Sequence, residues 1–382
     1  MMRPDCGENC LEHLDVREGE VIQYDSPLNP YQRALENKHL DCFRYVYESG
    51  YPRTELIWES VCEHGIEFLR YARQKGCPWD EIICASASRM GDLECLQYAH
   101  ENGCPWDEET CCVASQGGHL HCLRYARENG CPWDERTCAS ASNAGQIECL
   151  HYAHKHGCPW SERTCSEACE GGQMECLRYA HENGCPWDEV TCANASYGGH
   201  VDILRYLHQN GCPWDSRTCK SASANGNLEC LQYAHENGCE WDEETCRVAS
   251  SRGQLECLRY AHEHGCPWNG QTVRYASENG NIDCLIYALE NGCAVDVSGI
   301  EIHRSAVPIL YHHGVRLPEA CGEVVGDHRR THVRKAWCVL RCAVRWICAY
   351  DEACCRVYAP GGIGYRIAED SFRESVHGLE DD

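Results

Sequence analysis

The sequence predicts an all-α fold, an α-solenoid of stacked antiparallel helix pairs. Three observations predict it: a strict internal period, apolar residues at helical spacing inside each period, and a Gly-Cys step that recurs once in each period. Residues 104–130 read CPWDEETCCVASQGGHLHCLRYARENG, and the next residue begins CPWDERTCASASNAGQIECLHYAHKHG. The Gly-Cys step recurs every 27 residues from Cys77 to Cys293. Because no unit carries an insertion, each must present the same shape to its neighbours.

Each unit is predicted to form two short helices. In the quoted unit, Asp107 is a good N-cap, and two glutamates follow where negative charge suits the helix dipole. The glycines at 117–118 end the first helix. Leu123 and Ala126 mark the buried face of the second helix. Gly130 predicts a left-handed helix end, and the proline after the next residue prevents continuation.

The repeats divide the chain into three predicted segments. Residues 1–27 lack periodicity and form an N-terminal lead-in, and residues 28–318 hold about eleven units, counting the degenerate ones at 39–52 and 307–318. Residues 319–382 form a basic amphipathic extension with an acidic tail. One unit of this length cannot bury a core, so the units must cover one another.

Composition limits the function classes. The net charge is −25, which disfavours general attraction to nucleic-acid backbones. The N-terminus has no apolar signal region, and no run of 18 apolar residues exists to span a membrane. We therefore expect an intracellular protein in a reducing compartment, cytoplasmic or nuclear, and a monomer. No catalytic constellation or cofactor loop is recognisable, so we expect neither enzyme activity nor a cofactor.

The 35 cysteines fall mostly into three columns, a column being the set of equivalent residues in successive repeats. Phe68, Ile203 and Val273 replace cysteines in these columns, whereas histidine and aspartate never do. Equivalent residues of adjacent layers lie roughly 8–10 Å apart, too far for disulfides. The pattern favours buried packing over a metal or redox role. A histidine column containing Arg127 and Leu289 likewise favours a partly exposed row over a zinc site.

The string GGHLHCLRYARENGCPWD at residues 117–134 resembles the ankyrin-repeat sequence NGHLEVVKLLLEAGADVN, so the chain looks like a set of short, CPWD-type ankyrin-like repeats. Trp133 falls where ankyrin repeats bury a valine. The usual unit has 33 residues and a Thr-Pro-Leu-His tetrapeptide, which is missing here, so the hairpin between helix pairs is expected to be trimmed. The resemblance implies a non-enzymatic scaffold that binds a protein along an extended concave face carrying the first helices.

Positions that vary on the first helices are the best candidates for partner contacts. They follow the second cysteine column or lie near the helix ends, whereas the neighbouring framework positions stay constant. Variation is equally what an unconstrained surface would show. The candidate partner-binding residues are Arg89, Met90, Tyr197, Lys220, Arg247, Arg252, Arg274 and Tyr275.

Two alternatives to the scaffold stay open: a cysteine-rich metal-binding or redox protein, and an adaptor that recruits a second protein through residues 319–382. Within that extension, residues 328–350 carry basic side chains, no acid and one apolar helical stripe. This stripe is suited to capping the last repeat, to binding a partner helix or acidic surface, or to lying on an anionic membrane.

Overall fold

The computed structural model describes residues 30–50, 61–76, 79–297, 301–315 and 317. The predicted lead-in and C-terminal extension lie outside these residues. All regular structure within them is helical, with no strand, as the sequence predicts. No described helix has both the length and the apolar composition that a membrane span requires. The chain divides into two compact units, each containing several repeats. We call Met1–Trp241 unit 1 and Asp242–Asp382 unit 2.

Unit 1 begins with α1 (Pro30–Glu36), α2 (Leu40–Glu48), the 3₁₀ helix η1 (Cys62–His64) and α4 (Ile66–Gln74). Regular helix pairs follow, and in each the helix after the CPWD position is called the first helix. The first helices are α5 (Glu81–Met90), α7 (Glu108–Gln116), α9 (Glu135–Asn143), α11 (Glu162–Glu170), α13 (Glu189–Gly198) and α15 (Ser216–Asn225). The second helices are α6 (Leu93–Glu101), α8 (Leu120–Glu128), α10 (Ile147–Lys155), α12 (Met174–Glu182), α14 (Val201–Gln209) and α16 (Leu228–Glu236).

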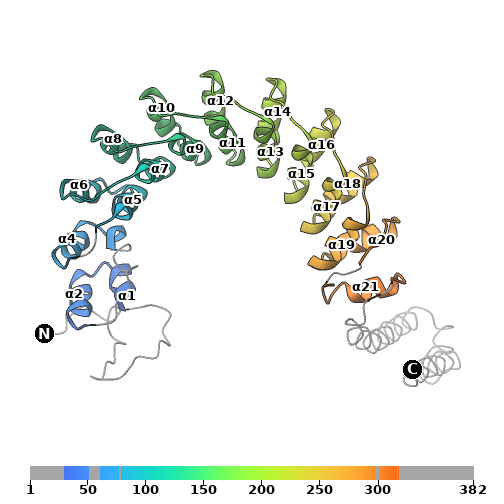
Figure 1. Cartoon of the computed structure of the whole chain (residues 1–382), viewed down its shortest axis with the longest axis horizontal. Helices are drawn as coiled ribbons and strands as arrows, with labels where there is room; N and C mark the ends of the chain where they lie inside the picture. Colours follow the sequence, from blue (N-terminus) through green and yellow to red (C-terminus); the bar gives the residue numbers. More distant parts are fainter. Residues whose placement is uncertain (1–29, 51–60, 77–78, 298–300, 316, 318–382) are drawn as a thin grey trace, which may run out of the picture. The chain divides into compact units, whose positions relative to one another are not determined.

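Unit 2 continues the same pattern. Its first helices are α17 (Glu243–Arg252) and α19 (Gly270–Asn279), and its second helices are α18 (Leu255–Glu263) and α20 (Ile282–Glu290). The short α21 (Val307–His312) lies within residues 307–318, which the sequence predicts to be a degenerate last repeat. Within each unit, a first helix packs against its own second helix and against the next first helix, so the two kinds of helix form parallel rows (Figure 1).

Asparagine or aspartate side chains start most first helices. The Asp107 carboxylate accepts a hydrogen bond from the Glu109 amide at 3.1 Å, which confirms the predicted N-cap. At α13 the arrangement is a complete capping box, because Asp188 accepts from the Thr191 amide and the Thr191 hydroxyl accepts from the Asp188 amide. The six residues between α8 and α9 contain no strand, so the trimmed connection is also observed.

The end of a first helix is covered by a side chain of the following repeat. At α13, Gly199 adopts a left-handed φ of 79°, and Asn227 donates its amide group to the carbonyls of Ser196 at 2.9 Å and Tyr197 at 2.8 Å. Carbonyls near a helix end lack the usual amide donor four residues on, and Asn227 supplies a donor here. A Cβ atom on Gly199 would lie 2.7 Å from the Asn227 Oδ1 atom, so glycine permits this close approach.

The core consists of the constant residues of the repeat. Leucine, alanine and cysteine positions that recur in the repeats are buried, as at Leu150, Ala153, Cys138, Cys149 and Cys158. The apolar substitutes in the cysteine columns, Phe68, Ile203 and Val273, are equally buried. The prediction that cysteine serves as a small packing residue therefore holds for the residues that the structure describes.

Candidate functional site

Each first helix turns one side away from the core of the repeats, and we call this side its outer stripe: the residues at positions 2, 5, 6 and 9 of the helix. Positions 2 and 9 are at least partly exposed, whereas positions 5 and 6 are buried in several helices. In α13 these are Val190, Ala193, Asn194 and Tyr197, which have the i, i+3, i+4, i+7 spacing of one helical face. The intervening Thr191, Cys192, Ala195 and Ser196 are buried. Because framework and outer stripe occupy opposite faces, the outer stripe can change without disturbing the core.

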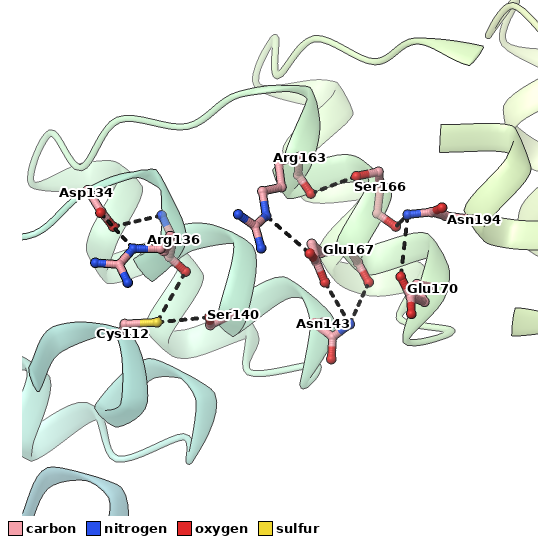
Figure 2. Close-up of polar contacts among 10 residues, drawn as sticks. All are labelled: Cys112, Asp134, Arg136, Ser140, Asn143, Arg163, Ser166, Glu167, Glu170 and Asn194. Carbon is pink, nitrogen blue, oxygen red and sulfur yellow. Dashed lines mark hydrogen bonds and ion pairs between the residues drawn. The ribbon is translucent and has the colours of Figure 1, made fainter. Parts of the chain in front are cut away.

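Outer stripes of adjacent helices touch through polar contacts (Figure 2). The thiol of Cys112 on α7 lies 3.1 Å from the hydroxyl of Ser140 on α9. Asn143 on α9 donates to the Glu167 carboxylate on α11 at 3.0 Å. On α13, Asn194 approaches the Glu170 carboxylate at 3.5 Å. The row of first helices is thus a continuous polar surface within unit 1, on which a few apolar side chains stand out.

In unit 1 the predicted candidates lie on three first helices. Arg89 and Met90 end α5, and both are exposed, with Met90 at 52%. Tyr197 is 45% exposed at the end of α13. Lys220 is half-buried on α15. The structure thus places all four on the row of first helices but spreads them along it.

In unit 2 the candidates make a local cluster. Arg247 on α17 donates to Glu244 at 2.6 Å and places its guanidinium 4.9 Å from the ring centre of Tyr275 on α19. Glu244 raises the pKa of Arg247. Arg274 donates to Glu278 at 3.3 Å. Arg252 is exposed at the end of α17. Arg247, Arg274 and Tyr275 therefore take part in ionic and cation–π contacts on the surface of unit 2. The sequence did not reveal these contacts.

The histidine column is an aromatic joint between repeats. The His154 ring stacks on Trp160 with centroids 3.7 Å apart, and its Nδ1 atom lies 2.8 Å from the Tyr179 hydroxyl of the next second helix. Equivalent joints occur at His100, His208 and His262. Sequence reasoning predicted a partly exposed row but missed this partnership.

Arginine in this column preserves the same geometry. The Arg127 guanidinium lies 4.2 Å from the centre of the Trp133 ring, and Arg73 covers Trp79 in the same way. A cation over an indole face is a favourable contact. In this column a tryptophan follows each histidine or arginine by six residues. This spacing is the sequence feature that could have indicated the contact. The Trp133 ring is half-buried, whereas the resemblance implied a buried position. One face of the ring is covered by the Arg127 guanidinium.

Several described cysteines are buried thiols that donate hydrogen bonds to backbone carbonyls of the preceding repeat. The Cys158 thiol donates to the Asp134 carbonyl at 3.2 Å, and Cys138 is hydrogen-bonded to Cys158. This bond and burial raise the pKa of Cys138. Burial raises the pKa of Cys122 to about 12. No cysteine whose side chain is described forms a disulfide, and no described group of His, Cys, Asp and Glu has a metal-binding arrangement.

Comparison with known proteins finds similarity among solved structures. No protein-family model matches the chain, and no curated protein matches it either. Among solved structures, the crystal structure of the human ASB11 ankyrin repeat domain is similar, with a TM-score of 0.35 and 19% sequence identity. The similarity covers 41% of this chain and 83% of that one. The α-solenoid described above is defined by this chain's own helices and their packing.

Proposed function

We propose that this chain is a non-enzymatic scaffold that binds a partner protein along the outer stripes of its first helices. The contrast between the two rows of helices carries the proposal. Outer stripes change in size, polarity and charge from repeat to repeat, whereas the buried framework stays constant. Four of the five exposed large apolar residues that the structure describes lie on first helices: Ile82, Met90, Val190 and Tyr197.

The second helices present a nearly uniform polar surface. Their second residue is exposed in every repeat from α6 to α20 and is a carboxylate in all but one, where it is His121. Regular, solvated charge of this kind supports solubility more readily than selective recognition. Selective protein contacts draw instead on apolar and aromatic side chains surrounded by polar ones. The first-helix row meets this description.

The candidate residues supply such contacts in each unit separately. In unit 1, Met90 and Tyr197 offer apolar area, and Arg89 and Lys220 add positive charge. In unit 2, the ring of Tyr275 is covered by Arg247. Arg252 at the end of α17 and Arg274, which precedes Tyr275 on α19, add positive charge. We propose that a protein partner contacts residues of this set. Arginine and tyrosine are enriched among the side chains that dominate binding energy.

Affinity capture with charge-reversed variants tests the proposal. The full chain is immobilised, retained proteins are identified, and the affinity of each purified partner is measured. The test variant carries Lys220→Glu, Arg247→Glu and Arg274→Glu. The matched control carries Arg178→Glu, Arg205→Glu and Arg259→Glu, the same charge change on exposed positions of second helices. We expect the test variant alone to lose affinity. Equal affinity for wild type and test variant would remove these three residues from the site, and loss in the control alone would place binding on the second helices.

A further inference from the structure

The outer stripe of α13 differs from the others in unit 1. Among the outer stripes of the first helices α5–α15, only that of α13 contains no charged residue. Val190 is 37% exposed at its start and Tyr197 is 45% exposed at its end. Between them lie Ala193, only 6% exposed, and the half-buried Asn194. Two large apolar side chains thus stand about 10 Å apart along the helix axis, with small side chains between them.

Negative charge predominates at both ends of this stripe. Near its start, the Arg217 guanidinium of α15 lies 2.8 Å from the Asp215 carboxylate and 3.7 Å from that of Glu189, the residue before Val190. Two carboxylates thus surround one guanidinium. Toward its end, the exposed Glu170 carboxylate of α11 lies 3.5 Å from the Asn194 amide. A segment lying along α13 would therefore meet net negative charge at each end.

We infer that Val190, Ala193, Asn194 and Tyr197, the α13 patch, bind the apolar face of an amphipathic helix from a partner protein. The inference rests on the proposed function and names the kind of partner. The partner helix places basic side chains at both ends of the patch, toward Glu189 and Asp215 at one end and toward Glu170 at the other. These charges select a basic amphipathic helix.

A helix suits this surface better than an extended strand. The backbone groups of α13 are already bonded within the helix, so no free edge is available for strand addition. A docked segment must satisfy its own backbone, which a helix does. A helix is about 10 Å across, comparable with the roughly 8–10 Å spacing of packed helices, so its flanks reach α11 and α15. One large side chain of the partner then covers Ala193, between Val190 and Tyr197.

A displayed peptide library tests the inference on the full chain. The probe is a phage library of 18-residue helical peptides with a fixed leucine stripe and flanking positions randomised among Glu, Lys, Gln and Ser. Enriched peptides are synthesised with a fluorophore, and their affinities are measured by anisotropy. The test variant, Val190→Gln with Tyr197→Gln, removes both apolar anchors without adding charge. The control, Met90→Gln, removes a more exposed apolar residue from α5. Thermal unfolding verifies that both variants fold.

We expect enriched peptides to carry Lys rather than Glu at both ends. Their affinity should fall at least about tenfold for the test variant and stay unchanged for Met90→Gln. No enrichment, or equal affinity for the test variant, would overturn the α13 assignment. Peptides that respond only to the Lys220, Arg247 and Arg274 reversals would overturn this assignment but retain the proposed function. Peptides that respond only to the Arg178, Arg205 and Arg259 reversals would overturn both.

Discussion

The Nδ1 atom of His154 lies 2.8 Å from the phenolic oxygen of Tyr179, and this contact joins two consecutive second helices. The same imidazole covers Trp160 at an interplanar angle of 15°. One side chain therefore links the end of one repeat to the first residues and the second helix of the next. In a solenoid, stability depends on such contacts between neighbours as much as on the repeats themselves.

Replacing His154 with arginine should preserve the joint, because Arg127 occupies the equivalent position over its own tryptophan. We expect His154→Arg to change the free energy of unfolding by less than about 0.5 kcal/mol. His154→Ala removes both the ring contact and the hydrogen bond and should cost about 1–2 kcal/mol. Urea unfolding followed by tryptophan fluorescence compares the two variants. If arginine destabilised as much as alanine, the guanidinium would not replace the imidazole here.

The His154 joint should also make stability depend on pH. Burial, with a smaller contribution from His151, lowers the pKa of His154 below its usual 6.5. Between the folded and unfolded pKa values the unfolded chain binds more protons, so stability falls as the pH drops below about 6.5. His154→Gln should flatten that part of the profile, measured as the urea midpoint from pH 7.5 to 5.5. An NMR titration of the His154 ring with a midpoint at or above 6.5 would contradict the sign.

Much of the fold followed from the sequence, because the period fixes where each helix starts and ends. Asp107, Gly130 and the buried cysteines perform the roles that their residue types predict. The polar contacts between repeats could not be predicted from the sequence. His154 and Tyr179 are 25 residues apart, and only stacking brings them together. The outer stripes could be located as variable positions, but Arg247 could not be assigned to Glu244 and Tyr275 without side-chain geometry, and Val190 was not singled out at all.

Two glycines with the same backbone conformation should differ in their tolerance of alanine. Gly184 and Gly199 both have left-handed φ values, 82° and 79°, but open space surrounds Gly184 whereas Asn227 lies against Gly199. We expect Gly184→Ala to cost about 1 kcal/mol from backbone strain. Gly199→Ala should cost about 1–2 kcal/mol more, because the Asn227 side chain must give up its hydrogen bonds to two carbonyls. Chemical unfolding measures both variants.

A double-mutant cycle isolates that contact. In an Asn227→Ala background the added methyl group of Gly199→Ala no longer meets the Asn227 amide group, so its cost should drop toward that of Gly184→Ala. An unchanged excess cost in this background would show that the penalty arises elsewhere.

A thiol of the second cysteine column should be replaceable by an apolar residue and not by a charged one. Cys165 is buried on α11, and its hydrogen bond with Cys185, together with burial, raises its pKa. Val273 fills the equivalent position of α19 without exposure. We expect Cys165→Val to cost less than about 1.5 kcal/mol. Cys165→Asp places an unpaired charge in the core and should cost about 3–5 kcal/mol. Urea unfolding in a reducing buffer measures both, and equal losses would show that the sulfur contributes more than packing.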